Sequence, residues 1–148
     1  MAFIKLKIVT PEKLVLEEEA YSVTLPAAAG EVTILPDHVP YVGMLKAGEL
    51  YFRRTATAEP ESLATAGGFV EFHDNTLTLL ADTAERAEDI DLAAAEAAHQ
   101  RAEQVMKERV SMNDEEYAKT AALIEREFAR LKVARKHHSR SGFVAPTE

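Results

Sequence analysis

The chain has 148 residues, of which 47% are hydrophobic and 28% charged, a balance typical of one folded domain or two small ones and not of a disordered chain. Its net charge of −8 argues against nucleic acid as a general partner, because such binding needs a basic surface that displaces counterions. The absence of cysteine excludes disulfides, thiolate metal sites and cysteine nucleophiles, and no uncharged stretch approaches the roughly 20 apolar residues of a membrane span. Residues 1–9 alternate lysines with apolar residues and do not form a signal-peptide core, so we expect a cytoplasmic setting.

Residues 1–86 have the hydrophobic pattern of β-strands. Apolar side chains occupy alternate positions, for example at Ile4, Leu6 and Ile8, and polar side chains lie between them. This alternation is typical of strands that bury one face and expose the other. Turn signals separate the strands: Thr10-Pro11, Ala29-Gly30, Pro36-Asp37, Ala47-Gly48, Gly67-Gly68 and Asp74-Asn75. Many short strands at this spacing predict an antiparallel β-sandwich or flattened barrel.

Residues 87–136 predict a second unit, an antiparallel hairpin of two helices, so the expected fold class is α+β. From Ala87 onward no glycine or proline occurs before Gly142, and alanine dominates. Asp91 is placed to cap the first helix, and Asn113 with Glu116 resembles a capping box for the second. The residues expected to face each other are Leu92, Ala95, Ala98, Ala102, Val105 and Met106 in the first helix and Tyr117, Ala121, Ile124, Phe128 and Leu131 in the second. Residues 137–148 are expected to form a flexible tail.

The alanine-rich face of the first helix predicts weak docking. Alanine buries far less area than leucine or phenylalanine, whose full burial contributes about 1.5–3 kcal/mol each. A helical pair of about 50 residues is also too small to support a core of its own, so it must pack on the sandwich or on another protein. Two interpretations remain open: the hairpin is a movable element, or alanine only permits close and permanent helix packing.

No catalytic or metal-binding constellation stands out. His38 lies in a proline-flanked turn and His73 lies beside Asp74, and both are interpreted as surface or loop histidines rather than as metal ligands or bases. The sequence has neither a nucleophile elbow nor a phosphate-binding loop. We therefore predict a protein without catalytic residues and without a metal site.

The end of the second helix is strongly basic. Between Arg126 and Arg140, six cationic residues stand against the single acid Glu127, which gives a local charge of +5. Compensation of the helix dipole needs only one or two cations, so we favour a basic helix that docks on an acidic partner surface or on phosphates. The candidate contact residues are Arg126, Arg130, Lys132, Arg135 and Lys136.

Two motifs resemble those of a known family. Residues 30–40 read GEVTILPDHVP and resemble the G-E-x-x-I-L-P-x-H-x-P signature of the epsilon subunit of F-type ATP synthases of the bacterial type. Residues 67–71, GGFVE, and residues 75–84, NTLTLLADTA, resemble a second signature of the same family. The resemblance runs from Leu6 to about Lys136 and implies an N-terminal β-sandwich followed by a C-terminal helical hairpin.

The resemblance implies a rotor subunit rather than an enzyme. In this family the sandwich binds the gamma stalk and the c-ring and helps couple proton or sodium flow to ATP synthesis. The hairpin, when it extends toward the alpha and beta subunits, inhibits ATP hydrolysis, and the basic helix would then meet beta. By the same resemblance, the gamma and c-ring interface contains Glu31, Pro36, His38 and Pro40. The implied location is peripheral, at the cytoplasmic face of the bacterial plasma membrane, with membrane contact only through the complex.

Some members of the family bind regulatory ATP through a motif I/L-D-x-x-R-A. Here residues 90–95 read IDLAAA, so Ala94 stands where the motif has arginine. Because the loss of one charge-assisted hydrogen bond costs roughly 1.5–3 kcal/mol, we expect weak or absent ATP binding. The other ATP contacts that the resemblance implies are Glu85, Asp91, Arg101, Arg126 and Arg130.

Two alternatives come from other classes of protein. A stand-alone ATP-sensing regulatory protein would bind ATP tightly without any stalk, so binding to gamma would separate it from the rotor subunit. An enzyme built on the sandwich would need a cluster of polar side chains that the sequence does not show.

Overall fold

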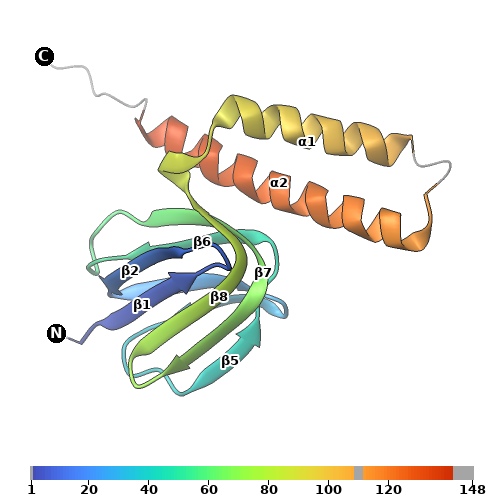
Figure 1. Cartoon of the computed structure of the whole chain (residues 1–148). Helices are drawn as coiled ribbons and strands as arrows, with labels where there is room; N and C mark the ends of the chain where they lie inside the picture. The colour runs from blue at the N-terminus through green and yellow to red at the C-terminus, as the bar shows by residue number, and fades with distance from the viewer. Residues whose placement is uncertain (1, 109–111, 142–148) are drawn as a thin grey trace, which may run out of the picture.

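The computed structural model describes residues 2–108 and 112–141. Within these residues the strands come first: β1 (Ile4–Val9), β2 (Leu14–Ala20), β3 (Ser22–Ala27), β4 (Gly30–Ile34), β5 (Tyr41–Met44), β6 (Gly48–Arg53), β7 (Glu61–His73) and β8 (Thr76–Arg86). A short 3-10 turn, η1 (Ala87–Asp89), leads to two helices, α1 (Leu92–Lys107) and α2 (Asp114–Ser141). Figure 1 shows the helices lying side by side along one side of the strands. The predicted α+β architecture, a β-sandwich followed by a helical hairpin, is confirmed.

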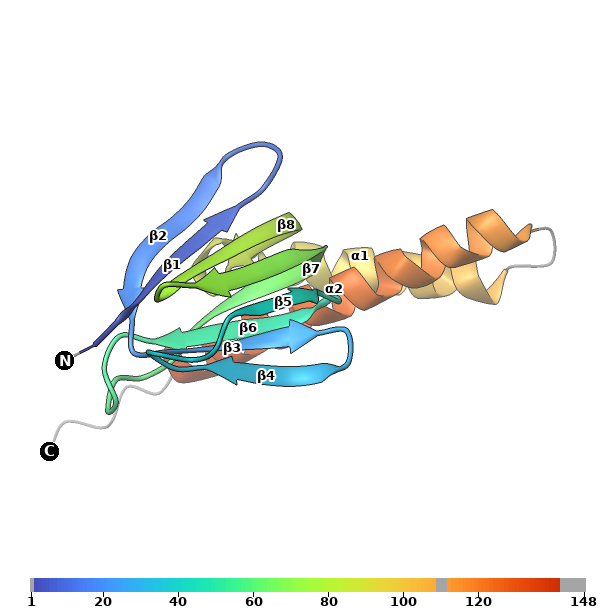
Figure 2. The same ribbon diagram turned by 90° about the horizontal axis from the view of Figure 1, so that it is seen from below.

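The strands form one folded sheet in the order β2-β1-β8-β7-β6-β3-β4, with β5 paired to β7. Figure 2 shows the two layers of the sandwich, with β1, β2 and β8 over β3, β4 and β6. The predicted antiparallel pairing is confirmed except between β1 and β8, which run parallel. β8 thus pairs antiparallel with β7 on one side and parallel with β1 on the other.

The 13-residue strand β7 bends in its middle. Its first half pairs with β6 and its second half with β5, while β8 pairs along most of its length. Gly67 and Gly68, which we expected in a turn between strands, lie at this bend with φ angles of 64° and 111°. A Cβ atom at Gly68 would collide with the carbonyl oxygen of Leu80 on β8. The bend therefore requires glycine, which alone adopts such angles without strain and lets the two backbones approach.

The β7–β8 hairpin closes through the predicted turn Asp74-Asn75. Both residues have positive φ angles (49° and 56°), the pattern of a two-residue turn whose twist matches that of the strands. Asn75 also ties this turn to the loop after β4: its Nδ2 donates to Asp37 Oδ1 at 2.9 Å, and its Oδ1 accepts from the Asp37 backbone N–H at 2.6 Å. The turn thus fixes the loop in which most of the predicted interface residues lie.

The sandwich has a hydrophobic core of its own. Ile4, Leu6 and Ile8 are fully buried, as their alternation predicted. The other buried members of this core are Leu16, Ala20, Val23, Leu25, Ile34, Leu45, Leu50, Phe52, Leu63, Val70, Phe72, Leu77 and Leu79. All of these residues belong to the strands or to the connections between them, so the sandwich does not need the helices to bury its apolar face.

Both helices begin at the predicted caps. Asp91 Oδ1 accepts a hydrogen bond from the Ala94 backbone N–H at 3.0 Å. Asn113 and Glu116 exchange two bonds: the Glu116 N–H donates to Asn113 Oδ1 at 2.8 Å, and the Asn113 N–H donates to Glu116 Oε2 at 3.2 Å. This reciprocal pair is a capping box with asparagine in place of serine or threonine.

The second helix ends later than expected. The predicted hairpin stopped at residue 136, but α2 continues to Ser141. No glycine or proline interrupts the added turn, and Arg140 Nη1 donates to the backbone oxygen of Pro60 at 3.3 Å, which holds the turn against the sandwich. The remainder of the predicted tail, residues 142–148, lies outside the described residues.

The hairpin docks on the sandwich through a small apolar cluster. α2 packs on β6 and β7, and α1 packs on α2 on the side away from the strands (Figure 1). The buried members of the cluster are Ala64, Ala87, Ile90, Ala95, Leu131, Val133 and Ala134. Four of these seven residues are alanine, which buries little apolar area, but only Ala95 belongs to α1, whose alanine-rich face was expected to make the docking weak.

The predicted contact stripes of the hairpin are only partly correct. Ala95 and Leu131 are buried, but Val105, Tyr117 and Phe128 are 46%, 44% and 58% exposed. In Figure 2 the far half of the hairpin extends beyond the sandwich, so the two helices there have only each other to pack on. Near its C-terminal end α2 buries a second face toward the sandwich, with the result that Ala129 and Val133, outside the predicted stripe, are buried.

Candidate functional site

The loop between β4 and β5 contains three of the four predicted interface residues, Pro36, His38 and Pro40. The His38 backbone N–H donates to Leu35 O at 3.1 Å, and the Asp37–Asn75 bonds join the loop to the β7–β8 turn. The His38 ring lies edge-on to Phe72, with the ring centroids 6.0 Å apart. A loop that holds two prolines and is bound at its middle has little conformational entropy to lose when it meets a partner.

Glu31, the fourth predicted interface residue, lies apart from this loop. It is exposed near the start of β4, opposite Pro26 of β3, whereas the loop follows the end of β4. At about 3.3–3.4 Å per residue, the strand separates Glu31 from Ile34 by roughly 10 Å. The structure thus brings Pro36, His38 and Pro40 together and places Glu31 at the other end of the strand.

A row of apolar side chains, all exposed except the half-buried Val9, crosses the outer face of the sandwich. Cross-strand pairing puts five residues in continuous register on β2, β1, β8, β7 and β5: Leu14, Val9, Leu80, Phe69 and Met44. Val42, two residues from Met44 on the same face of β5, extends the row and is 76% exposed. We call these six residues the apolar row. Soluble monomers rarely expose so continuous an apolar patch, which makes this face a candidate docking surface.

The alternation of apolar and polar residues in the strands contains a signal that could have identified the apolar row, which the sequence analysis missed. In β8, Leu77 and Leu79 are buried, so Leu80 stands at a position where a polar residue is expected. In β7, Phe69 stands next to the buried Val70 in the same way. Apolar residues on the face that should be wet are therefore informative, because they add nothing to the core of the domain.

Lys136, one of the predicted basic contact residues, pairs with an acid of the sandwich. Its Nζ lies 2.9 Å from Glu49 Oε1 on β6, and the Ser62 hydroxyl donates to the same oxygen at 2.8 Å. The Glu49 side chain is only 7% exposed. Burial raises the pKa of the Glu49 carboxyl, but the hydrogen bonds from Lys136 and Ser62 outweigh it and hold that pKa below its usual range.

Arg130 makes a second link between α2 and the sandwich. Its Nε lies 3.1 Å from Glu85 Oε1 on β8, and its Nη1 donates to Glu127 Oε2 at 2.8 Å. The Glu127 side chain is buried, so its charge depends on this partner. Burial alone lowers the pKa of Arg130, but the bond to Glu127 and the charge of Glu85 outweigh it and raise that pKa.

The other predicted basic contact residues are less engaged. Arg135 lies 3.5 Å from Glu96 of α1 in an exposed pair, and the positive charge of Lys132 helps to lower the pKa of Glu49. The Arg126 Nε atom is buried and has no hydrogen-bond partner among the described residues. In this conformation, several of the cations expected to meet an acidic partner are thus bound to acids of the chain itself.

The residues that the family resemblance implied for ATP do not surround one cavity. Arg126 lines a cavity of about 460 Å³ between α2 and the sandwich, which the other four do not line. Glu85 is bound to Arg130, and Asp91 is engaged as the cap of α1. Arg101 is exposed on α1.

The described residues hold no group of three or more His, Asp or Glu side chains that could bind a metal ion. In the same part of the chain, no helix has the length and apolar character needed to cross a bilayer. The described surface contains a stiff loop, the apolar row and a basic helix whose cations pair with acids of the same chain. These are features of a surface that binds other proteins.

Known proteins resemble this chain in sequence. Residues 3–87 match the family described as ATP synthase, Delta/Epsilon chain, beta-sandwich domain. The chain is 42% identical over 137 residues to the ATP synthase epsilon chain of Herpetosiphon aurantiacus, an alignment that covers 93% of this chain and 98% of that relative. It is 43% identical over 134 residues to the ATP synthase epsilon chain of Moorella thermoacetica, with coverage of 90% and 98%.

Solved structures resemble this chain in fold. A chain in the cryo-EM structure of the Euglena gracilis mitochondrial ATP synthase (OSCP/F1/c-ring) matches 91% of this chain and 82% of its own length, with a TM-score of 0.74 at 20% identity. A chain of the Tetrahymena thermophila mitochondrial ATP synthase central stalk and c-ring has a TM-score of 0.56 at 18% identity, with coverage of 90% and 95%. At these identities the likeness concerns the fold alone, but the sequence matches are decisive. The chain belongs to the ATP synthase epsilon chain family.

Proposed function

We propose that this chain is a non-catalytic rotor subunit of an F-type ATP synthase, which binds the gamma stalk and the c-ring and couples c-ring rotation to ATP synthesis. Membership of the family supports this role, and the apolar row supplies the structural observation that carries it. As part of that complex the chain lies peripherally at the cytoplasmic face of the bacterial plasma membrane and contacts the membrane only through its partners.

The apolar row and the loop after β4 form the docking surface for gamma in this proposal. β5, which contributes Val42 and Met44 to the row, follows directly on the loop that holds Pro36, His38 and Pro40. An interface of this kind combines an apolar centre with a stiff polar rim, as stable protein interfaces do. Glu31, at the far end of β4, extends the contact surface toward the c-ring.

We predict that Phe69→Asp weakens binding to purified gamma about ten- to hundredfold. The substitution removes a side chain whose burial contributes roughly 1.5–3 kcal/mol and places a charge against an apolar partner. Because Phe69 is already 56% exposed, the sandwich itself should keep its stability. Titration calorimetry of the full chain with gamma measures the effect.

The matched control for this prediction is Thr57→Asp, which adds the same charge at an exposed position of the β6–β7 connection, outside the apolar row. This variant should bind gamma like the unmodified chain. Equal affinities of the Phe69→Asp variant and the control would contradict the assignment of the apolar row to gamma.

The hairpin inhibits ATP hydrolysis, in this proposal, when it leaves the sandwich and extends toward the alpha and beta subunits. Two observations support a releasable hairpin: an apolar docking cluster made mostly of alanine, and ion pairs such as Lys136–Glu49 and Arg130–Glu85. An acidic surface on beta can replace Glu49 and Glu85 as partners of these cations, so release need not leave them unpaired.

Regulatory ATP binding is weak or absent in this proposal. Ala94 lacks the motif cation, and only Arg126 of the implied contacts lines the cavity between α2 and the sandwich. Titration calorimetry of the full chain with ATP should give no micromolar affinity, while Ala94→Arg should strengthen whatever binding exists. Micromolar affinity of the unmodified chain would contradict this expectation and would favour an ATP-sensing protein.

A further inference from the structure

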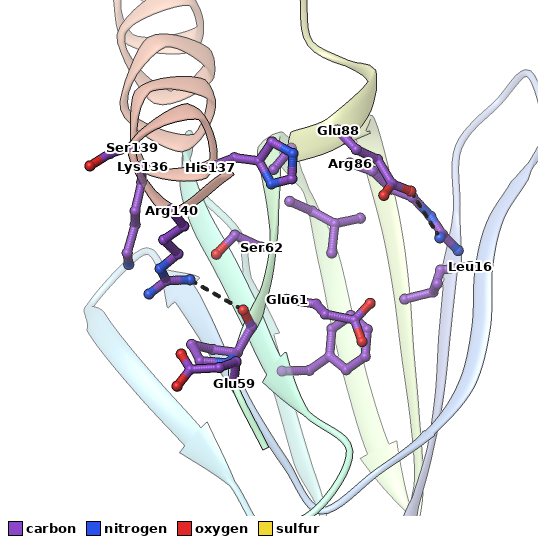
Figure 3. A pocket seen from close by; sticks show the side chains of 14 residues that line it. Leu16, Glu59, Glu61, Ser62, Arg86, Glu88, Lys136, His137, Ser139 and Arg140 are labelled. Carbon is purple, nitrogen blue, oxygen red and sulfur yellow. Dashed lines mark hydrogen bonds and ion pairs between the residues drawn. The ribbon is translucent and has the colours of Figure 1, made fainter. Parts of the chain in front are cut away.

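The two ends of the sandwich are built differently. At one end, the last turn of α2 meets the start of β7 and the end of β8 around a cavity of about 650 Å³, lined by Arg140 and the ion pair of Arg86 with Glu88 (Figure 3). β7 and β8 run from there to the opposite end (Figure 1), where the turn Asp74-Asn75 is bonded to the loop after β4. No residue of that turn or loop lines the cavity. The turn and the loop therefore form a contact separate from the one that holds the hairpin.

Asn75 connects three segments at this second end. Its Nδ2 donates to Asp37 Oδ1 at 2.9 Å, and its Oδ1 accepts from the Asp37 backbone N–H at 2.6 Å. Its backbone oxygen accepts from the N–H of Lys5, at the start of β1, at 2.8 Å. Asp37 belongs to the motif of residues 30–40 and Asn75 to that of residues 75–84, so this one side chain joins the two sequence motifs in space.

Asp37 adopts a backbone conformation that contacts from outside the loop must hold. Its φ angle is 64°, in the left-handed region that residues other than glycine rarely adopt. Within the described residues, the other non-glycine residues with positive φ are Asp74 and Asn75, so all three meet at this contact. Such conformations persist where the surrounding structure over-determines them, and here the two hydrogen bonds of the Asn75 side chain do so.

The loop held in this way presents apolar side chains to solvent. Leu35 is 46% exposed and Val39 is 70% exposed. The His38 backbone N–H donates to Leu35 O, but this bond lies within the loop and does not fix how the loop is placed on the sandwich. The pair of Asp37 with Asn75, by contrast, joins the loop to the sheet. It therefore sets the direction in which Leu35 and Val39 point.

We propose that Asn75 is the positioning residue of the docking loop: through Asp37 it holds residues 35–40 in the conformation in which Leu35 and Val39 meet the partner surface. This role rests on the proposed function, in which the same loop docks on gamma. A loop already held in its bound conformation loses little conformational entropy on docking. A loop that is free binds only during the fraction of time in which it adopts that conformation.

Asn75→Gly removes the side chain of this contact and keeps the two-residue turn, which glycine favours. In the isolated full chain, the backbone N–H order parameters of His38 and Val39 should fall from about 0.85 to below about 0.6. Titration calorimetry with purified gamma should show about three- to tenfold weaker binding, as expected for a loop that is competent to bind for about a third to a tenth of the time.

The matched control is Asp74→Gly, which introduces glycine at the neighbouring position of the same turn. Asp74 also has a positive φ angle (49°), but its side chain lies 3.4 Å from that of His73 and makes no printed bond to the loop. This variant should keep the order parameters of the loop and the affinity for gamma. In both variants the amide signals of Ser62 and Ala87, at the hairpin end, should keep their positions, because the effect is confined to the loop.

Exchanging the two side chains should restore the contact. Asn75→Asp alone removes the donor and places a second carboxylate beside that of Asp37, so it should weaken binding to gamma at least as much as Asn75→Gly does. Combining Asn75→Asp with Asp37→Asn again provides one donor and one acceptor, at unchanged net charge. The affinity for gamma should then return to within about twofold of that of the unmodified chain.

Four results would each overturn this role of Asn75: native affinity of the Asn75→Gly variant, an equal loss of affinity in the Asp74→Gly variant, unchanged order parameters of the loop, or no recovery when the two side chains are exchanged. Failure of the proposed function gives a different result, since the unmodified chain itself would then not bind gamma. In that case the role of Asn75 in docking fails with it.

Discussion

Single charged residues hold the hairpin on the sandwich. The carboxylate of Glu49, 7% exposed, receives hydrogen bonds from Lys136 and Ser62, and Arg130 joins Glu85 to the buried Glu127. Since the apolar docking cluster is mostly alanine, these contacts supply a large share of the specificity of docking. They are also contacts that can be exchanged for similar ones on a partner.

Glu49→Gln should lower the free energy of unfolding at pH 7 by about 1.5 kcal/mol, the low end for a hydrogen bond to a charged group, because Lys136 is partly exposed. Urea denaturation followed by circular dichroism measures the change. The control is Glu96→Gln, which removes the acid of the exposed Arg135 pair and should change stability by no more than a few tenths of a kcal/mol. Similar losses in both variants would contradict a special role for the Glu49 carboxylate.

The same contact predicts a dependence on pH. The pKa of Glu49 is lowered in the folded chain, so its stabilising contribution is complete above the unfolded pKa of about 4.3 and is lost as pH falls through the lower folded value. The stability difference between the unmodified chain and Glu49→Gln should therefore be constant from pH 6 to 7 and shrink below about pH 4. A difference that stays the same at pH 3 would contradict this linkage.

Among the elements, the bent strand β7 shapes the sandwich. Gly67 and Gly68 allow one strand to pair first with β6 and then with β5. The bend also sets the place of Phe69, which follows it directly and contributes to the apolar row. A local backbone requirement thus positions a residue of the proposed gamma surface.

Gly68→Ala should destabilise the chain by about 2–6 kcal/mol, since it adds a steric collision with the Leu80 carbonyl to the strain of a positive φ angle. Gly30→Ala is the matched control, because Gly30 has a φ of 134° but open space around its Cβ position, so only the strain of about 1–3 kcal/mol applies. Denaturation midpoints of the two variants measure the difference. An equal loss in both would contradict the importance of the close approach between β7 and β8.

The local elements could be predicted from the sequence because their signals are local. Alternation located the core of β1, and short-range capping patterns located the starts of both helices at Asp91 and Asn113. The bend at Gly67-Gly68 was mistaken for a turn, because a glycine pair fits both and only the partner strand decides between them.

The contacts between distant segments could not be predicted in this way. The pairing of Lys136 with Glu49 depends on how the hairpin is placed on the sandwich, which no pattern within either segment encodes. Phe128 is 58% exposed although its ring centroid lies 6.1 Å from that of His99 on α1, and this exposure likewise depends on how the two helices pack. Of the interface residues carried over from the family motif, the loop residues are close together, whereas the separation of Glu31 needed the strand geometry.

The whole molecule consists of two units, the sandwich and the hairpin. They are joined by a small apolar cluster and by ion pairs that can be replaced by similar pairs with a partner. The sandwich has its own core, whereas the hairpin shares a small cluster with the sandwich and extends beyond it (Figure 2). Tyr117 and Phe128 of α2 are exposed. This division favours a sandwich that stays fixed on its partners and a hairpin that moves. The small docking cluster favours release of the hairpin over the alternative of permanent packing.

The ATPase activity of the assembled complex shows directly whether the hairpin leaves the sandwich to inhibit hydrolysis. Complexes are reconstituted with the full chain, with a chain that ends at residue 86, and with the Glu49→Gln variant. Deletion of residues 87–148 should raise ATP hydrolysis, because the inhibitory element is gone, and Glu49→Gln should lower it, because the hairpin leaves the sandwich more readily. Hydrolysis that is unchanged by the deletion, in a complex that still contains the sandwich, would contradict an inhibitory role of the hairpin.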